Sequence, residues 1–301
     1  MTGLVLAGLV LAPWLASGDA RAAPPVWTVR GPRGVITLFG SVHMLPPGLD
    51  WRSPALDAAL AGADSLWFEL PIDDATNAAA VRLTTSRARL PAGDTLWAHL
   101  TPAQRERLHR AATALGVSAD ALTPLRPWMA ELVLSLADAR RAGAVADAGV
   151  EGRIQAAAPP AARRMALETV EDQVAVLTGG TLAEQVTSLD ETARETVDDP
   201  GLYERTVREW LEADLPGLDR DDIAPLRRVA PSAWRRLILD RNRRWARTLE
   251  RLARRPGKAV VVVGVGHLVG DDGVPAMLRA RGLTVDGPGV STAAKTLSRP
   301  D

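Results

Sequence analysis

The 301-residue chain contains no cysteine. This absence excludes disulfide bonds, cysteine nucleophiles and zinc sites built on thiolates. Any transition metal would therefore have to be held by histidine and carboxylate side chains. Histidine is itself scarce, with four in the whole chain. Few positions can thus supply an imidazole, either as a metal ligand or as a group that titrates near neutral pH.

A net charge is also absent, because 36 lysine and arginine residues balance 36 aspartate and glutamate residues. This balance gives no electrostatic reason to expect a nucleic acid or an anionic membrane surface as a partner. Beyond the N-terminal region, no apolar run approaches the roughly 20 residues that a membrane-spanning helix needs. The hydrophobic fraction of 47% and the charged fraction of 24% are typical of a globular protein with a substantial core.

An apolar run over Leu4–Ser17 is the main targeting signal in the sequence. It leads into Ala20-Arg21-Ala22, which has the small-residue pattern of a signal-peptide cleavage site. We therefore predict a signal peptide over residues 1–22 and a periplasmic or secreted mature protein. Pro13 interrupts the run and no positive charge precedes it, so an N-terminal helix or an uncleaved anchor is the alternative.

Strand-forming segments cluster at both ends of the sequence, whereas helical patterns fill the middle. This order predicts an α/β fold with a single domain, in which a large central helical region covers a mixed central β-sheet formed from N- and C-terminal strands. We place the domain over residues 23–290 and a flexible C-terminal tail over residues 291–301. The turn Gly31-Pro32-Arg33-Gly34 predicts a hairpin near the N-terminus. The expected strands are Val26–Val29, Val35–Phe39, Ser65–Leu70, Met165–Glu168, Ala259–Val263 and Leu283–Val285.

Helix boundaries are well marked in the central region. Thr101 followed by Pro102 predicts a helix start, and Gly116 predicts the end of that helix. Thr181–Glu184 has the pattern of a capping box. Apolar residues recur at helical spacing in an arginine-rich segment near the C-terminus and predict one long amphipathic helix: Trp234, Ile238, Trp245, Leu249 and Leu252.

Two of the four histidines occur in the same local pattern, G-x-x-H directly after an apolar strand. These are His43, after Gly40-Ser41-Val42, and His267, after Gly264-Val265-Gly266. Glycine at a strand end lets the backbone turn and approach a ligand, and ligands bind at the carboxyl edge of open α/β sheets. We therefore expect both imidazoles at one site. His99 and His109 lie in or beside the helix that starts near Pro102 and are expected to be surface or packing residues.

Glu69 and Glu168 end two further apolar strands, so four strand ends each deliver a group that can bind a metal or move a proton. Two imidazoles with the Glu69 carboxylate suit a divalent transition metal such as zinc, manganese or cobalt. Without a metal, a histidine serves as a general base. The alternative is that each glutamate caps a helix or pairs with an arginine, and that each histidine is a turn residue.

Arg241 belongs to the apolar stripe of the late helix, three residues after Ile238 and four before Trp245. An inward-facing arginine needs an anion, which is either a site carboxylate, a developing oxyanion of the substrate, or a structural partner. Asn242 is a weaker candidate beside it. We expect substrate to contact Asn242 and the residues of the two G-x-x-H motifs, namely Gly40, Ser41, Gly264 and Gly266.

The chain resembles the TraB/GumN family, which is related to the Tiki metalloproteases and more distantly to the erythromycin esterase group. The resemblance rests on Gly40–His43, Trp67–Leu70 and Gly264–Gly270 and spans nearly the whole predicted domain. Further similar elements are Leu167-Glu168-Thr169 followed by Gln173, Asp240-Arg241-Asn242, and Gly149-Val150-Glu151. The resemblance implies an α/β fold, and the Tiki branch implies metal-dependent proteolysis.

These observations favour a metal-dependent hydrolase, in particular a peptidase. His43, Glu69 and His267 would hold the ion, Glu69 or Glu168 would move the proton, and Arg241 would face the oxyanion. The expected partner is a peptide or small-molecule substrate. One alternative is a non-catalytic protein that sequesters a peptide or other ligand in the same cleft. The other is a metal-independent, esterase-like hydrolase with His43 as the base.

Overall fold

The computed structural model describes residues 23–289 of the chain. Within this range six strands form one mixed sheet, in the order β4-β3-β5-β2-β1-β6. The strands are β1 (Val26–Arg30), β2 (Gly34–Ser41), β3 (Ser65–Phe68), β4 (Arg163–Ala166), β5 (Gly257–Gly264) and β6 (Thr284–Asp286). N- and C-terminal strands are therefore neighbours, as the sequence predicts, and β4 alone comes from the middle of the chain.

The predicted N-terminal hairpin is confirmed. β1 and β2 pair antiparallel, with Val26 opposite Phe39 and Arg30 opposite Val35. The turn between them packs closely on a helix end, since a Cβ atom on Gly31 would lie 2.3 Å from the carbonyl oxygen of Ala253. Glycine is required there for close approach of two backbones.

Four adjacent strands run parallel, and this brings their carboxyl ends to one edge of the sheet. β5 lies between β2 and β3, with Ser41 opposite Gly264 and Phe68 opposite Val262. β4 pairs with the other side of β3. The segments that follow these four strands therefore start side by side, at the edge where open α/β sheets bind their ligands.

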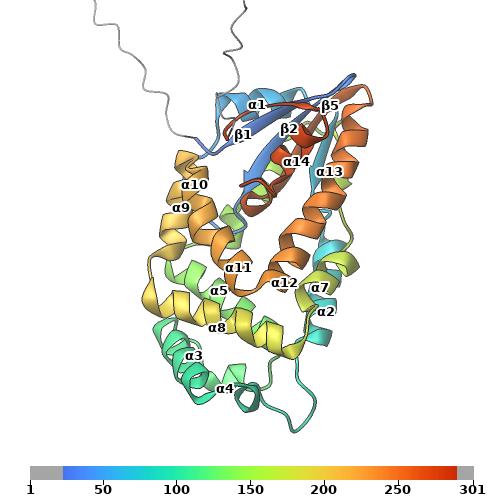
Figure 1. Cartoon of the computed structure of the whole chain (residues 1–301). Helices are drawn as coiled ribbons and strands as arrows, with labels where there is room; N and C mark the ends of the chain where they lie inside the picture. Colours follow the sequence, from blue (N-terminus) through green and yellow to red (C-terminus); the bar gives the residue numbers. More distant parts are fainter. Residues whose placement is uncertain (1–22, 290–301) are drawn as a thin grey trace, which may run out of the picture.

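Helices account for most of the remaining chain (Figure 1). The α-helices are α1 (Pro54–Ala61), α2 (Asp74–Arg87), α3 (Pro102–Ala114), α4 (Ala119–Leu122), α5 (Pro127–Arg141), α6 (Val150–Ala157), α7 (Val170–Thr178), α8 (Leu182–Asp198), α9 (Leu202–Glu212), α10 (Leu215–Leu218), α11 (Ala224–Val229), α12 (Pro231–Trp234), α13 (Asp240–Ala253) and α14 (Val274–Ala280). Shorter helical segments are η1 (Leu96–His99), η2 (Ala146–Ala148), η3 (Asp219–Ile223), η4 (Arg235–Leu239) and η5 (Val265–His267).

The sheet is covered on both faces. One face packs against α1, α6 and α9, whose buried residues include Leu60, Ile154 and Trp210. The other face packs against α13 and α14, through residues such as Trp245 and Leu278. Because alternate strand residues point to opposite faces, the valines of β5 contribute to both cores, and this explains why β5 is a continuous apolar run.

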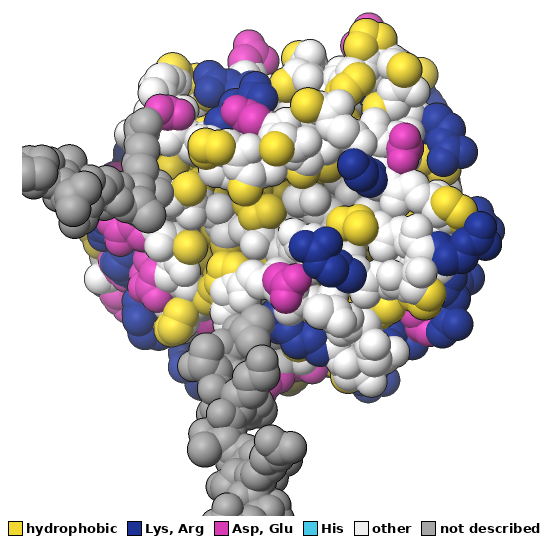
Figure 2. Space-filling view, turned by 90° about the horizontal axis from the view of Figure 1, so that it is seen from above, with side chains coloured by type: hydrophobic (Ala, Val, Ile, Leu, Met, Phe, Trp, Pro, Cys, Tyr) yellow, Lys and Arg dark blue, Asp and Glu magenta, His cyan; other side chains and the backbone are white. Residues whose placement is uncertain are grey.

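A third hydrophobic core lies away from the sheet, among α3, α5 and α8, in the lower part of Figure 1. Thr101 and Thr181 accept hydrogen bonds from the first turns of α3 and α8 and form a capping box in each helix, as the sequence predicts. The opposite, upper face of the molecule shows acidic, basic and apolar side chains interspersed, and no histidine (Figure 2). This view agrees with the balanced charge of the chain.

The long amphipathic helix expected near the C-terminus is present, but it is not a regular α-helix. It runs through α12, the π-helical turn η4 and α13 without a break. A π-turn adds a residue to one turn and often occurs beside functional groups. Here it directly precedes Asp240 and Arg241, so it sets the direction in which the Arg241 side chain leaves the helix.

Residues 1–22, the predicted signal peptide, and residues 291–301, the predicted tail, lie outside the described residues. Among the described helices, none combines the length and the apolar character that a membrane crossing requires.

Candidate active site

A cavity of about 380 Å³ opens at the carboxyl ends of the parallel strands. His43, Glu69 and Glu151 contribute its ionisable groups, and Gln173 contributes an amide. The rest of its lining comes from the strands β3 and β5, the chain after β3, and α2: Phe68, Leu70, Pro71, Ile72, Thr76, Asn77, Ala80 and Val262. A cavity of this size suits a small ligand or one end of a longer one.

His43 lies two residues after β2, and 69% of its side chain is exposed. Its Nδ1 atom lies 2.6 Å from Oε1 of Glu151 at the start of α6. An ionised carboxylate only accepts hydrogen bonds, so Nδ1–H donates and Nε2 is left for a ligand. The Glu151 carboxylate raises the pKa of His43 to about 9. At neutral pH the pair is therefore an imidazolium and a carboxylate.

Glu69 follows β3 and is almost fully buried at the base of the cavity. Its Oε1 accepts a hydrogen bond from the backbone N–H of Gly264 at 2.7 Å, and Oε2 accepts from Gln173 at 3.4 Å and from Arg241. Burial acts to raise the pKa of Glu69, but its surroundings, among them Arg241, His43 and the Gly264 N–H, hold this pKa below its ordinary value. The permanent charge among them is that of Arg241, so Glu69 is ionised at neutral pH.

Arg241 is buried behind Glu69 and is held between two carboxylates. Its guanidinium donates to Glu69 and, through both Nε and Nη2, to Glu168. The Nε bond to Glu168 measures 3.1 Å. The guanidinium also stacks on Trp245, 4.6 Å from the ring centroid. Of the partners that the sequence allows for this inward arginine, the structure thus provides two carboxylates.

His267 lies in η5 and is buried, and its hydrogen bonds fix its tautomer. Nε2 lies 3.0 Å from Nη1 of Arg241, which can only donate. Nδ1 lies 2.6 Å from Oδ1 of Asn242, whose amide nitrogen donates to the carbonyl oxygen of Asp272. The ring is therefore neutral, with the proton on Nδ1. Burial is the largest cause that lowers its pKa, to about 3.

The two G-x-x-H histidines converge, as the sequence predicts. A Cβ atom built on Gly264 would have Oε1 of Glu69, Cδ2 of His267 and Nε2 of His43 within 4 Å. Since both rings lie within 4 Å of one point, these two ring atoms are less than about 8 Å apart. Gly264 therefore marks the centre of the site, and a side chain at this position would fill the space between the two histidines.

The five residues expected to catalyse are brought together, but they occupy two layers. His43 and Glu69 line the cavity. Glu168, Arg241 and His267 are buried behind Glu69 and are absent from the described lining of the cavity. These three side chains lie close to the lining at Glu69, which Arg241 contacts directly.

The residues expected to contact substrate lie around the same edge, yet the described lining of the cavity includes none of them. Gly40 packs on Val265, and its carbonyl oxygen accepts from the indole of Trp210 at 2.9 Å. Ser41 is buried at the end of β2. Gly266 faces η3, where a Cβ atom on this glycine would lie 2.8 Å from Cδ1 of Ile223. Asn242 orients His267, and Gly264 binds Glu69, as described above.

The donor atoms expected to hold a metal are engaged by the protein itself. Nε2 of His267 accepts from Arg241, and Oε2 of Glu69 accepts from Arg241 and Gln173. A cation at bonding distance from these atoms would lie against a guanidinium of the same charge. Among the described residues, no three histidine or carboxylate side chains are arranged to hold a metal ion. The arrangement therefore does not fit a metal at His43, Glu69 and His267.

Glu151 is a candidate site residue that the pattern of strand ends does not reveal. The resemblance points to it through Gly149-Val150-Glu151, and the structure gives the physical reason for that glycine. A Cβ on Gly149 would lie 2.2 Å from the carbonyl oxygen of His43. The close approach lets the start of α6 reach the histidine loop, where Val150 N–H donates to the carbonyl oxygen of Val42. Gln173, the last residue of the L-E-T…Q element, also comes from a distant helix, α7, and donates a hydrogen bond to Glu69.

The other two histidines are packing residues, as expected. His109 stacks on Trp97 with 4.4 Å between ring centroids. His99 lies 2.8 Å from the carboxylate of Asp94. Both lie in the helical region beside α3 and take no part in the described cavity.

Comparison with known proteins identifies the family of the chain. The model of the TraB/PrgY/gumN family matches residues 25–287. The chain belongs to this family. Uncharacterized protein YbaP of Escherichia coli (strain K12) is 28% identical over 244 residues, which cover 80% of this chain and 87% of that protein. The YbaP protein of Shigella flexneri matches to the same extent. An uncharacterized protein of Treponema pallidum (strain Nichols) is 23% identical over 269 residues, 85% of this chain and 80% of that protein. No solved structure matches the chain significantly.

Proposed function

We propose that this protein is a hydrolase of peptide or related bonds, in which His43 and Glu151 act as a proton-transferring pair and Glu69 as the second carboxylate. The observation that carries the proposal is the 2.6 Å bond between Nδ1 of His43 and Glu151, which leaves Nε2 for a reacting group in the cavity. A carboxylate that holds a histidine in one tautomer is a recurrent device of general-base catalysis.

In this reaction Nε2 of neutral His43 takes a proton from water, and the water oxygen forms a bond to the carbonyl carbon of the substrate. The bond to the leaving nitrogen or oxygen then breaks, and His43 returns the proton to the leaving group. Because Glu151 raises the pKa of His43 to about 9, the neutral ring is a minor form at pH 7. We therefore expect the rate to increase as the pH rises towards 9.

The buried layer has a supporting role in this proposal. Arg241 keeps Glu69 ionised and, with Gly264 and Gln173, fixes its orientation. Neutral His267 supplies an acceptor to Arg241 and adds no charge. A preorganised carboxylate of this kind favours the positive charge that His43 gains when it takes the proton, and it does not have to reorganise to do so.

A metal-dependent peptidase is the form of this activity that the Tiki resemblance implies. It would require Arg241 to withdraw from Nε2 of His267 and from Glu69, so that both can coordinate an ion. We assign no step to a metal. Elemental analysis of the purified protein, and turnover before and after zinc, manganese or cobalt is added, separate the two forms.

A non-catalytic, sequestering protein is the second candidate. The observation in its favour is that three of the five expected catalytic side chains are buried behind the cavity and do not line it. Such a protein would bind a ligand saturably at His43 and Glu69 without turnover.

The deciding experiment incubates the protein with a peptide library and an ester library and follows products by mass spectrometry. We expect turnover that increases with pH and falls about 10²- to 10⁴-fold in His43→Ala, the range that a general base commonly contributes. Wild-type protein that is inactive on both libraries, with and without divalent metals, contradicts the proposal and favours the sequestering protein.

A further inference from the structure

The charges around the cavity are not balanced. Among the described residues that line it, the only ionisable side chains are Glu69, Glu151 and His43, and there is neither lysine nor arginine. Arg241 lies behind the lining and is already shared between Glu69 and Glu168. A ligand in the cavity therefore faces the carboxylates of Glu69 and Glu151. The positive groups beside them, Arg241 and His43, already bond to carboxylates of the protein.

Among the described side chains that line the cavity, two carboxylates face one imidazolium. His43 and Glu151 form one pair of opposite charges, 2.6 Å apart. Behind the lining, Arg241 lies between Glu69 and Glu168, and Glu168 also pairs with Arg244 at 3.8 Å. Glu69 is the member of this buried group that lines the cavity, so the unpaired negative charge in the lining is that of Glu69. A carboxylate group on a ligand would be repelled there, whereas an ammonium group would be attracted.

Glu69 also has acceptor capacity left. Its Oε1 atom accepts one hydrogen bond within the protein, from Gly264, and a carboxylate oxygen can accept two. A protonated amine, with three donors, matches such a group better than an amide does. The remaining lining is mostly apolar and uncharged, from Leu70 to Ile72, Ala80 and Val262, with Thr76 and Asn77 as neutral polar groups.

We infer that the cavity recognises the amino end of its ligand: a protonated amine against Glu69, next to an apolar side chain that packs on Ile72 and Ala80. The natural ligands of this chemistry are peptides with a free amino terminus. The inference deepens the proposed hydrolase and rests on it for turnover, because the hydrolysed bond would then lie near the amino terminus. The preference for an amine over a carboxylate is a property of binding and is tested without turnover.

Three small probes share one apolar side chain and differ in charge: leucinamide is cationic, N-acetyl-leucinamide is neutral and N-acetyl-leucine is anionic. Binding is measured from the rise in melting temperature with probe concentration, since a ligand of the folded state stabilises it in proportion to its occupancy. We expect leucinamide to bind at least about tenfold more tightly than N-acetyl-leucinamide, and N-acetyl-leucine to give no shift. Equal affinities, or no shift with leucinamide, overturn the inference.

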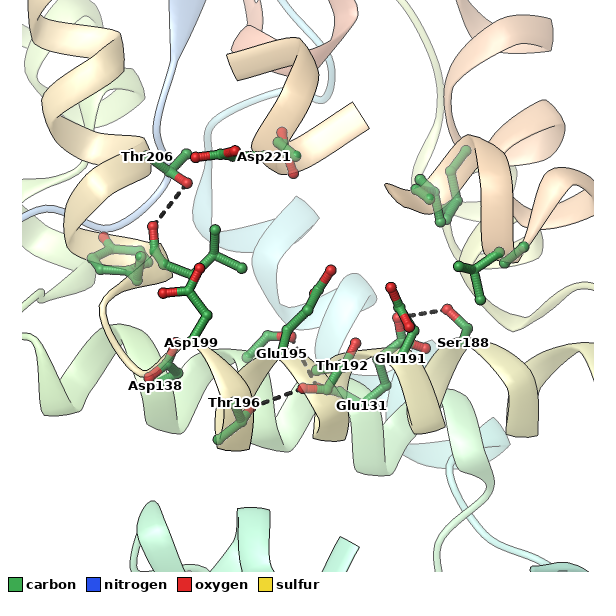
Figure 3. Close-up of a pocket in the computed structure, with 18 residues that line it drawn as sticks. Glu131, Asp138, Ser188, Glu191, Thr192, Glu195, Thr196, Asp199, Thr206 and Asp221 are labelled. Atoms are coloured by element: carbon green, nitrogen blue, oxygen red, sulfur yellow. Dashed lines mark hydrogen bonds between the residues drawn. The ribbon is translucent and has the colours of Figure 1, made fainter. Parts of the chain in front are cut away.

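A second acidic cavity makes it necessary to locate the binding. It is lined by α5 and α8 on one side and by α9, η3 and α11 on the other, and Figure 3 shows Glu131, Glu195 and Asp221 among its lining residues. Glu69→Gln should abolish leucinamide binding, whereas Glu131→Gln should retain it. The opposite result assigns the amine to the second cavity and contradicts the inference.

Glu69→Gln also disturbs Arg241, so a second variant guards against loss of the fold. Ala80 lies on α2, a helix with no buried residue among those described, and it lines the cavity. Ala80→Lys should therefore fold, repel leucinamide and allow N-acetyl-leucine to bind. An Ala80→Lys protein that still prefers leucinamide contradicts the inference.

Peptide turnover separates this inference from the proposed function. Peptides cleaved equally well with free and acetylated amino termini would overturn the inference and leave the hydrolase standing. Absence of any cleavage, with leucinamide still preferred, would remove the hydrolase and leave the amine site standing.

Discussion

Nη1 of Arg241 donates to Nε2 of His267 across 3.0 Å in the interior of the protein. The same ring donates from Nδ1 to Asn242 at 2.6 Å. Both nitrogens of His267 are therefore used within the protein, whereas Nε2 of His43 faces the cavity. Two histidines in the same sequence motif thus have different surroundings: both nitrogens of His267 are bonded within the protein, and the His43 side chain lines the cavity.

We predict that alanine substitutions at these two histidines have different effects on stability. His267→Ala removes a buried ring and leaves Arg241 with one acceptor fewer, so it should lower the free energy of unfolding by about 2–4 kcal/mol. His43→Ala removes an exposed side chain and a partly exposed ion pair, and should cost less than His267→Ala because solvent screens the lost charge pair. Urea unfolding followed by tryptophan fluorescence measures both. If the two variants unfold at the same urea concentration, the supporting role of His267 is wrong.

We predict that the two imidazoles also titrate at opposite ends of the pH range. The Glu151 carboxylate raises the pKa of His43 to about 9, and burial lowers that of His267 to about 3. NMR of histidine-labelled protein resolves four rings and needs no substrate. Glu151→Gln should move the pKa of His43 down towards its ordinary value of 6.5, by at least about one unit, without protonating His267 above pH 5.

The linkage to stability has a definite sign for His267. Its folded-state pKa lies below the unfolded value of 6.5, so folding excludes a proton. Its contribution to stability is complete above pH 6.5 and is lost as the pH falls towards 3. A His267 ring that protonates near pH 6.5 in the folded protein is incompatible with the hydrogen bond from Arg241.

The strand ends of the site follow from the sequence because they depend on local patterns. Two apolar runs are followed by Gly-x-x-His and a third ends at Glu69. These runs predict the strands, and they also predict that the carboxyl ends of the strands lie at one edge of the sheet. The inward direction of Arg241 also follows, from its spacing to Ile238 and Trp245. The period matches the geometry between Arg241 and Trp245, which both lie in α13, whereas Ile238 lies in the π-turn η4.

Other parts of the site depend on contacts between distant segments and carry no local signal. Glu151 reaches His43 only because α6 packs against the loop after β2. The π-turn η4 inserts into a helix whose apolar spacing looks regular. The division into an accessible and a buried layer depends on distant helices: α2 contributes to the cavity lining, and Gln173 on α7 donates to Glu69. Periodicity predicts which way a side chain points, but not what else packs there.

Export is predicted from residues 1–22, which lie outside the described residues. Cleavage after Ala22 should give a mature protein that begins at Ala23 when the full chain is produced in a bacterium with a periplasm. Mass spectrometry of the osmotic-shock fraction measures this N-terminus, and Ala22→Arg should block processing because the cleavage site needs a small residue. An unprocessed chain in the cytoplasmic fraction would show that the localisation is wrong.

The second cavity, of about 340 Å³, should make stability fall as the pH rises. Burial raises the pKa of Glu131 on α5 and of Glu195 on α8 to about 7. Glu131 accepts a hydrogen bond from Ser188 at 2.8 Å, which glutamine would also accept. A carboxyl whose folded-state pKa is raised keeps its proton in the folded protein between pH 4.5 and 7. Folding then binds a proton, and the associated stability is lost as the pH rises through this window.

Glu131→Gln replaces the carboxyl by a group that stays neutral. The free energy of unfolding of the variant minus that of the wild type should therefore increase by about 1 kcal/mol or more from pH 4 to pH 8. Urea unfolding at several pH values gives this difference directly and cancels the titration of groups common to both proteins, His267 included.

Glu250→Gln is the matched control, because Glu250 is paired with Arg254 and Arg281, which lower its pKa. That variant should gain no stability as the pH rises. A constant difference between Glu131→Gln and the wild type from pH 4 to pH 8 would mean that Glu131 ionises normally, and that water enters the cavity freely enough to solvate its charge.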